Sequence, residues 1–273
     1  MLQQTRVAVV RDRYADFLRR FPNVERLAAA KLPDVLAAWS GLGYYRRARA
    51  LHAAAQQLVQ QGGFPRTAED LASLPGIGRY TAAAIASIAF DQRRAVVDGN
   101  VERVLGRLFA ISERDTWGAA GELLSPGRPG DFNQAMMELG ATVCLPKAPL
   151  CAKCPALAWC QTRGTGPSRG SLLRRKKAIA YRLAIRSRNV FLVQRESHTS
   201  LMPGMWELPQ TRHGAGKLIL RLRHAITNTD YDVSVYLART ANGARGRWAN
   251  LDKVERLPLT GLTQKILRRS NLI

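Results

Sequence analysis

Residues 67–82 read TAEDLASLPGIGRYTA, two helical stretches joined by Pro75-Gly76-Ile77-Gly78. The two glycines permit a tight turn and leave backbone N–H groups uncovered at the start of the second helix. A phosphate group can bind at such a position. The alternative interpretation is an ordinary packing joint between two helices, which needs no ligand.

An acidic residue follows this turn about twenty residues later. The apolar run Ala95-Val96-Val97 ends in Asp98-Gly99-Asn100, so a carboxylate stands at the mouth of the next predicted helix. Capping that helix would by itself be the commoner role of Asp98. The LPGIG pattern, however, is typical of a helix-hairpin-helix, which holds the DNA backbone without reading its sequence. This neighbouring motif favours a functional role for Asp98.

All four cysteines of the chain fall within 17 residues, with the spacing C-x6-C-x2-C-x5-C. One loop can bring the four thiolates around a single point, as a 4Fe–4S cluster requires, and Lys147 and Lys153 lie between the ligands. Structural zinc, which usually has two CxxC knuckles or added histidines, is an alternative, as are disulfides or free thiols. The predicted cluster ligands are Cys144, Cys151, Cys154 and Cys160.

The chain is strongly basic, with a formal net charge of +22 over 273 residues. Residues 1–160 hold 20 basic and 14 acidic side chains, whereas residues 161–273 hold 22 basic and 6 acidic ones. Such an excess favours a polyanionic partner, usually nucleic acid, over a merely solvated basic surface. No run approaches the ~18 apolar residues of a membrane span, and no secretory signal heads the chain. We therefore expect a cytoplasmic, nucleoid-associated protein with no membrane partner.

The organisation along the chain suggests two domains. Residues 1–160 show helical, Ala-rich periodicity, including 46–61, 67–73, 79–90 and 100–110. Residues 161–177 lack an apolar period and carry Gly, Pro, Ser and basic residues, as a linker does. Residues 178–273 contain runs rich in Val, Ile and Tyr that are typical of strands. The predicted fold is a mainly α domain followed by a small α+β domain.

The hairpin, the VDGN segment and the cysteine loop, in this order and spacing, resemble the helix-hairpin-helix, iron–sulfur DNA glycosylases. Lyase-type members carry a lysine in the second helix of the hairpin, where this chain has Tyr80. A phenol cannot form a Schiff base, which argues against the lyase branch. Three further segments resemble the MutY family of adenine DNA glycosylases: LQQT at 2–5, GLGYY at 41–45 and FNQAMM at 132–137.

This resemblance implies excision of adenine mispaired with 8-oxoguanine or guanine in double-stranded DNA, by a monomer. It implies catalytic roles for Asp98, Tyr80 and Asn100. It also implies DNA contacts from Gln4, Thr5, Tyr44, Gly76, Gly78 and Arg79. The glutamate that protonates the leaving adenine in this family would stand two residues before Met1, so we expect an internal start or a truncation. The alternative function is therefore a mismatch-binding protein that does not cut.

The C-terminal part resembles the MutT-like domain of the same family, from Ala180-Tyr181-Arg182 to the segment WELP at 206–209. The segment QTRHGAGKL, which follows at 210–218, offers none of the acids that hold magnesium in a Nudix hydrolase. The domain is thus expected to read DNA and not to hydrolyse a nucleotide. His224, Thr227 and Asn228 align with the family's 8-oxoguanine recognition loop. An ordinary strand edge is the alternative for this stretch.

Overall fold

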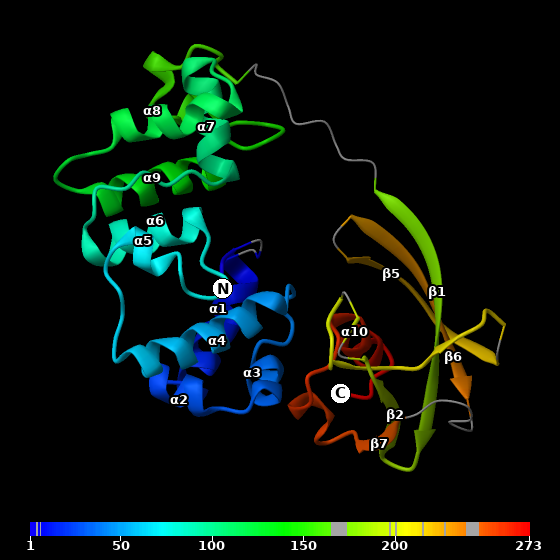
Figure 1. The fold of residues 1–273 in the computed structure, drawn as a ribbon. Helices are drawn as coiled ribbons and strands as arrows, with labels where there is room; N and C mark the ends of the chain where they lie inside the picture. Colours follow the sequence, from blue (N-terminus) through cyan, green and yellow to red (C-terminus); the bar gives the residue numbers. More distant parts are fainter. Residues whose placement is uncertain are drawn as a thin grey trace. The chain divides into compact units, whose positions relative to one another are not determined.

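The structure is a computed structural model of the 273-residue chain. It describes residues 1–3, 5, 7–164, 174–196, 198–199, 201–214, 216–226, 228–238 and 246–273. The chain divides into two compact units (Figure 1). One unit contains Met1–Gln60 together with Leu172–Ile273, and the other contains Gln61–Ser171.

The unit of residues 61–171 is helical. Its helices are α5 (Ala68–Leu71), α6 (Arg79–Phe90), α7 (Gly99–Phe109), α8 (Thr116–Leu123) and α9 (Pro129–Thr142), with short 3-10 turns η1 (Glu113–Asp115), η2 (Cys151–Lys153) and η3 (Leu157–Trp159). Helix α9 packs on both α6 and α7, and two of its glycines make these approaches possible. A Cβ on Gly130 would lie 2.6 Å from the Ser87 carbonyl oxygen, and one on Gly140 would lie 2.6 Å from Asn100 Cβ. The close crossing holds the start of α7 firmly in place.

The helices of the other unit are α1 (Val7–Arg20), α2 (Val24–Ala29), α3 (Leu32–Ala38) and α4 (Arg46–Gln61). Their core contains Val35, Phe17, Phe21 and Trp39, and the Phe17 ring meets the edge of the Trp39 ring at a centroid distance of 5.9 Å. Apolar residues from Leu2 to Phe21 recur with a helical period, which predicts a helix that includes Leu2, but in the structure α1 begins at Val7.

In the described residues, the rest of this unit is a sheet with one α-helix of nine residues. Its elements are β1 (Arg175–Arg186), β2 (Asn189–Gln194), β3 (Trp206–Glu207), β4 (Gln210–Thr211), β5 (Lys217–Ile226), β6 (Thr229–Ala238), β7 (Arg247–Asn250), η4 (Val254–Arg256) and α10 (Gly261–Arg269). The strand order is β3-β2-β1-β6-β5, while β4 pairs with β1 and β7 with β2. Strands β1 and β6 are parallel and the other pairs are antiparallel.

One face of this sheet is apolar and packs against α10. Because side chains alternate along a strand, Leu183 of β1 and Val235 of β6 point to the same side, where they join Ile266 and Leu267 of α10 in one buried core. The predicted succession of a mainly helical part and a smaller α+β part is confirmed.

The two compact units of the structure do not coincide with the domains predicted from the sequence, 1–160 and 178–273. Residues 1–60 group with the sheet: the buried Tyr45 hydroxyl donates to the Leu259 carbonyl at 3.1 Å, and Met205 is fully buried in the core of α1–α4. Arg175, Lys176 and Lys177, expected in a linker, already belong to β1 because they pair with β6. The domain boundaries drawn from motifs stay a prediction. None of the helices in the described part of the chain is long and apolar enough to cross a membrane.

Candidate active site

The turn at residues 74–78 has the geometry that the sequence predicts. Thr67 caps α5 by accepting a hydrogen bond from the Asp70 backbone N–H, and Gly76 adopts φ +76°, a conformation that favours glycine. Gly78 is the N-cap of α6, and no side chain caps the helix there. A Cβ on Gly78 would meet nothing within 4 Å, so the backbone is open to an approaching group. The exposed Arg79 lies beside this opening, with its guanidinium carbon 3.8 Å from the centre of the Trp117 ring.

Asp98 is the N-cap of α7 and is half-buried. Its Oδ1 accepts hydrogen bonds of 2.8 Å from the backbone N–H groups of both Asn100 and Val101, and its Oδ2 accepts one of 3.0 Å from Asn100 Nδ2. The capping role is therefore real, and it fixes the carboxylate in one orientation. Because a carboxylate oxygen can accept two hydrogen bonds, Oδ2 keeps acceptor capacity beyond its bond with Asn100.

Tyr80 lies in the first turn of α6, and its phenol is within range of the Asp98 charge. Burial raises the pKa of the Tyr80 phenol, and the charge of Asp98 raises it further. The hydroxyl donates to the Met137 sulfur at 3.3 Å. Tyr80, Asp98 and Asn100, which the sequence predicts as catalytic, are thus together in one region of the structure.

The segment that leads to Asp98 is held by a buried asparagine. Asn133 of α9 accepts from the Val96 backbone N–H at 3.2 Å and donates to the Ser87 hydroxyl and the Arg94 carbonyl at 2.9 and 2.8 Å. It therefore ties the extended run 94–96 to α6 and α9. The resemblance included Asn133 only as part of FNQAMM, and the structure supplies its role.

Two arginines of α7 connect this region to the cysteine loop, and the sequence reasoning missed both. Arg103 donates from Nη2 to Asn100 Oδ1 at 2.9 Å and from Nε to the Cys144 carbonyl at 2.8 Å. The buried Arg107 donates to the carbonyls of Leu145 and Pro146, and its Nη1 lies 3.4 Å from the Cys144 sulfur. Their spacing of four residues places them on one helix face, which was the available signal.

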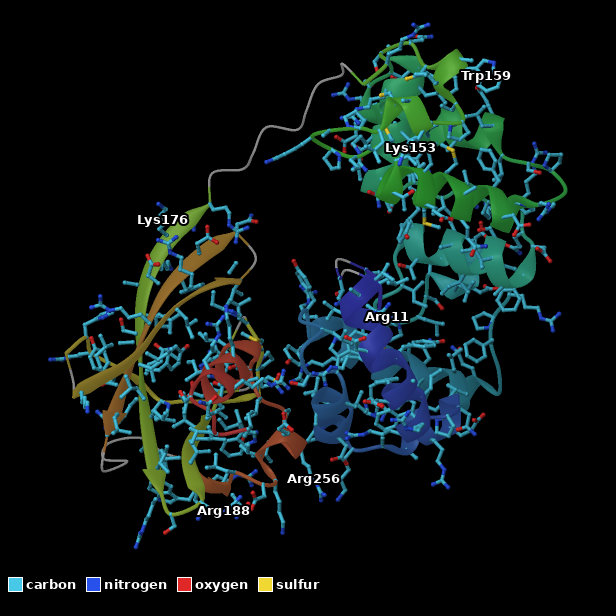
Figure 2. The ribbon with its side chains drawn as sticks, turned by 180° about the vertical axis from the view of Figure 1, so that it is seen from behind. Arg11, Lys153, Trp159, Lys176, Arg188 and Arg256 are labelled. Carbon is cyan, nitrogen blue, oxygen red and sulfur yellow. The ribbon has the colours of Figure 1, made fainter. Side chains whose placement is uncertain are left out.

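The cysteine loop follows α9 directly. Its four thiols are half-buried and none is in a disulfide. Backbone bonds from Gln161 to Leu108 and from Thr162 to Arg107 return the end of the loop to α7. Lys153 and Trp159 belong to the loop, and Trp159 is 71% exposed (Figure 2). Among the residues that the structure describes, no group of three or more His, Cys, Asp or Glu side chains is gathered as a metal site.

The predicted DNA contacts near the N-terminus are arranged around Arg47. Its guanidinium donates to the Met1 carbonyl at 2.9 Å, to the Gln3 carbonyl and to the Thr5 hydroxyl at 2.8 Å. Tyr44 has φ +46°, an unusual conformation for an aromatic residue, and its side chain is half-exposed. Gln4 lies outside the described residues.

The predicted 8-oxoguanine residues lie near the β5–β6 hairpin. His224 is on strand β5, so the expectation that it lies in a loop is wrong; its backbone pairs with Tyr231 of β6. Burial lowers the pKa of His224, and the nearby Lys265 lowers it further. Asn228 is exposed beyond the end of β5, and its carbonyl accepts from the Arg175 backbone N–H. Thr227 lies outside the described residues.

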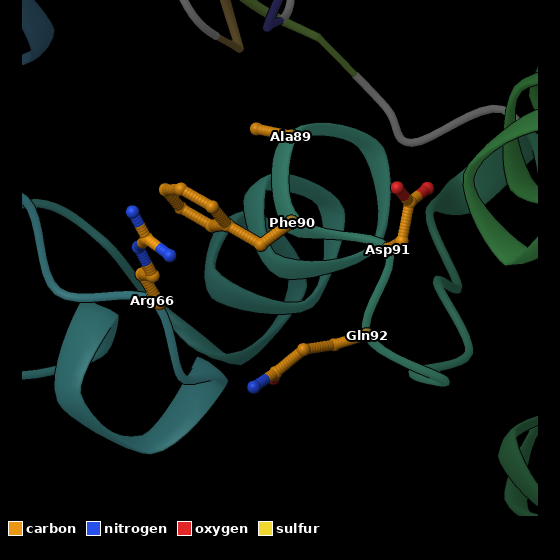
Figure 3. Close-up of a pocket in the computed structure, with 5 residues that line it drawn as sticks. All are labelled: Arg66, Ala89, Phe90, Asp91 and Gln92. Atoms are coloured by element: carbon orange, nitrogen blue, oxygen red, sulfur yellow. The ribbon is translucent and has the colours of Figure 1, made fainter.

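A separate hollow of about 550 Å³ lies at the C-terminal end of α6. It is lined by Arg66, Ala89, Phe90, Asp91 and Gln92 (Figure 3). In this view the Arg66 and Phe90 side chains lie at the left, whereas the Asp91 carboxylate lies at the right. This hollow contains none of the residues that the sequence predicts as functional.

The N-terminal part of the chain matches a known protein family. Residues 1–128 match the family model of the HhH-GPD superfamily base excision DNA repair proteins. The matched segment includes the PGIG turn, Tyr80 and Asp98, while the cysteine loop follows it.

The chain is similar to adenine DNA glycosylases. It is 54% identical to that of Mus musculus over 172 residues, which cover 59% of this chain and 33% of the relative. It is 34% identical to that of Buchnera aphidicola subsp. Schizaphis graminum over 225 residues, which cover 77% of this chain and 65% of the relative. The chain thus spans about a third of the mouse relative. Among solved structures, a thermostable thymine-DNA glycosylase matches with a TM-score of 0.55 and 28% identity, covering 59% of this chain and 79% of that one.

Proposed function

We propose that this chain removes adenine mispaired with 8-oxoguanine or guanine in DNA by hydrolysing its N-glycosidic bond. The observation that carries the proposal is the orientation of Asp98. Two backbone N–H groups and Asn100 fix its carboxylate at the start of α7, beside Tyr80. The uncapped N-terminus of α6 at Gly78 supplies a place for a DNA phosphate within the same unit.

The chemistry needs a carboxylate that is fixed and ionised. An adenine must leave the base stack before an enzyme can act on it. As the base departs, the sugar develops positive charge, and a preorganised carboxylate stabilises that charge or bonds to the sugar transiently. Asp98 has this role in our proposal, and Asn100 orients its carboxylate.

Tyr80 makes the reaction a hydrolysis without strand cleavage. A lyase needs an amine that forms a Schiff base with the sugar, and the phenol of Tyr80 offers none. Its raised pKa keeps the phenol neutral and able to donate a hydrogen bond near Asp98. The product should therefore be an intact strand with an abasic site.

We also propose that the cysteine loop holds a 4Fe–4S cluster. The donor set fits, because four free, half-buried thiols come from one loop and the Arg107 guanidinium can offset their negative charge. Cys144, Cys151, Cys154 and Cys160 would be the ligands. The bound cluster would supply four iron–sulfur bonds that fasten the loop. Iron and sulfide analysis of anaerobically purified protein tests this; zinc in place of iron would contradict it.

The sheet domain, in this proposal, is MutT-like and reads the 8-oxoguanine strand through the end of the β5–β6 hairpin. Asn228 is exposed there, and the half-buried His224 is four residues away on β5. The lowered pKa of His224 keeps its ring neutral, so it can accept as well as donate a hydrogen bond.

A base-release assay tests the function. Duplexes carrying adenine opposite 8-oxoguanine, guanine or thymine are incubated with excess protein, and strand breaks are scored with and without alkali. We expect alkali-dependent breaks at adenine opposite 8-oxoguanine and guanine, and none opposite thymine. Breaks without alkali would indicate a lyase. Tight binding of the mispair without any base release would instead support a mismatch-binding protein.

A further inference from the structure

The sheet has a second face that no helix covers in the described part of the chain. Residues of β1, β6 and β5 that alternate with the apolar core residues point to this side. A hollow of about 650 Å³ lies there. Its lining includes the small residues Ala178 and Ser234, the basic residues Arg221 and Arg223, and the acidic residue Asp232.

The two arginines at this hollow make few polar contacts with the described part of the protein. The Arg221 side chain is exposed and makes no hydrogen bond or ion pair with any residue that the structure describes. The Arg223 side chain is paired only with Asp232, at 3.3 Å between Nε and Oδ1, and both side chains are largely exposed. An exposed pair of this kind contributes little to stability, so it can open to an incoming anion at small cost.

This face lies next to the hairpin that the proposed function places on DNA. Positions 221 and 223 are on one side of β5, and β5 ends at Ile226. At about 3.4 Å per residue, Arg223 and Arg221 lie about 10 and 17 Å from the end of the strand. Lys176 lies on the same side of β1, on the far side of β6 from β5, and pairs in register with Asp230 near the start of β6. Lys176, Arg223 and Arg221 therefore lie along this face, on the two strands that flank β6. Asp230 and Asp232 of β6 lie between them on the same face.

We propose that the open face of β1, β6 and β5 binds the phosphate backbone of the DNA that flanks the mispair. Arg221 and Arg223 are about 6.8 Å apart along the strand, which matches the axial rise of two nucleotides at about 3.4 Å each. The small lining residues Ala178 and Ser234 allow a sugar-phosphate chain to approach the sheet closely. That DNA is the polyanion rests on the proposed function.

The experiment measures the salt dependence of binding by the full chain. Affinity for a duplex with a central A:8-oxoguanine pair is measured by fluorescence anisotropy over a range of salt concentrations. The test variant is Arg221→Gln/Arg223→Gln. The matched control is Arg186→Gln/Arg188→Gln, because Arg186 is exposed and Arg188, like Arg223, is paired with an exposed aspartate, Asp252. Figure 2 shows Lys176 and Arg188 at opposite ends of the sheet.

The slope of log K against log salt changes by about 0.9 for each phosphate that the protein no longer neutralises. We expect a slope smaller by about 1.8 for the test variant and an unchanged slope for the control. Equal changes in the two variants would mean a general effect of charge and would overturn the proposal. Two shortened duplexes, each lacking the flank on one side of the mispair, add a second test. The difference from wild type should vanish with only one of them, and its persistence with both would also overturn the proposal.

Failure of this inference and failure of the proposed function remain distinguishable. The base-release rate under saturating protein reports the function, and the control variant Arg186→Gln/Arg188→Gln should not change it. If no base is released at all, the proposed function fails, while the salt slopes on the same duplexes still decide whether this face binds DNA.

Discussion

Arg103 and Cys144 are joined by a hydrogen bond of 2.8 Å from the arginine Nε to the cysteine carbonyl. The same guanidinium donates to Asn100 Oδ1, and Asn100 Nδ2 donates to Asp98 Oδ2. The proposed reactive carboxylate and the first cysteine of the loop therefore belong to one hydrogen-bonded series. A disturbance of the loop should reach Asp98 through these bonds.

Arg103→Leu should destabilise the helical unit. The substitution leaves the carbonyls of Cys144 and Gly140 and the amide oxygen of Asn100 without their charged donor. Losing such bonds costs about 3 kcal/mol of unfolding free energy. Urea unfolding measures this, with Arg114→Leu as the control because Arg114 is exposed. Equal stability of the two variants would show that the series is unimportant.

The two glycines of the turn should respond differently to alanine. Gly76→Ala forces a side chain into φ +76°, which costs about 1 kcal/mol or more of stability. Gly78→Ala meets nothing within 4 Å and keeps an allowed backbone, so its stability should be nearly unchanged. Its new methyl group nevertheless occupies the space that a phosphate needs. Thermal unfolding and DNA affinity together check this; a Gly78→Ala variant with unweakened DNA binding would rule out the phosphate site.

The Arg195–Glu207 pair should be needed for a stable sheet domain. Arg195 donates from Nη1 to both carboxylate oxygens of the buried Glu207, at 2.9 and 2.8 Å. Arg195→Met leaves a buried charge without a partner, which costs about 3–5 kcal/mol of unfolding free energy. Glu207→Gln in the same chain should restore much of the loss. Chemical denaturation of the single and double variants tests this, and a harmless Arg195→Met would contradict it.

Alkaline pH should weaken the fold partly through Tyr181. Burial raises the pKa of the Tyr181 phenol far above its ordinary value of 10, and the charge of Glu207 adds to this effect. Because the pKa is raised in the folded state, the stabilisation is fully present below pH 10 and is lost as the pH rises through the folded pKa. Tyr181→Phe should therefore lose less stability above pH 10 than wild type. Parallel curves of unfolding free energy against pH would disprove this.

The sequence predicts those parts of the site that depend on local spacing. The PGIG turn and the capping of α7 by Asp98 each follow from a few consecutive residues, and the structure has both. Arg103 was missed because its partner Cys144 is 41 residues away, and such pairing leaves no local pattern. The grouping of residues 1–60 with the sheet was missed for the same reason, since Tyr45 and Leu259 are 214 residues apart.

At strand β5 the resemblance to a known motif predicts a loop where the structure has a strand. Leu218, Leu220 and Leu222 stand at alternate positions, as in a half-buried strand. The resemblance of residues 224–228 to a recognition loop instead predicts that the strand has already ended at His224. In the structure His224 belongs to the strand, and Asn228 lies beyond it.

The role of Asp98 is tested most directly by Asp98→Asn in single-turnover base release from an A:8-oxoguanine duplex. The amide can still accept the capping bonds from Asn100 and Val101, so folding and DNA binding should be retained. It carries no charge to stabilise the developing cation, so the rate should fall by ~10²-fold or more. A variant that binds the duplex normally and releases adenine as fast as wild type would contradict the assignment of Asp98.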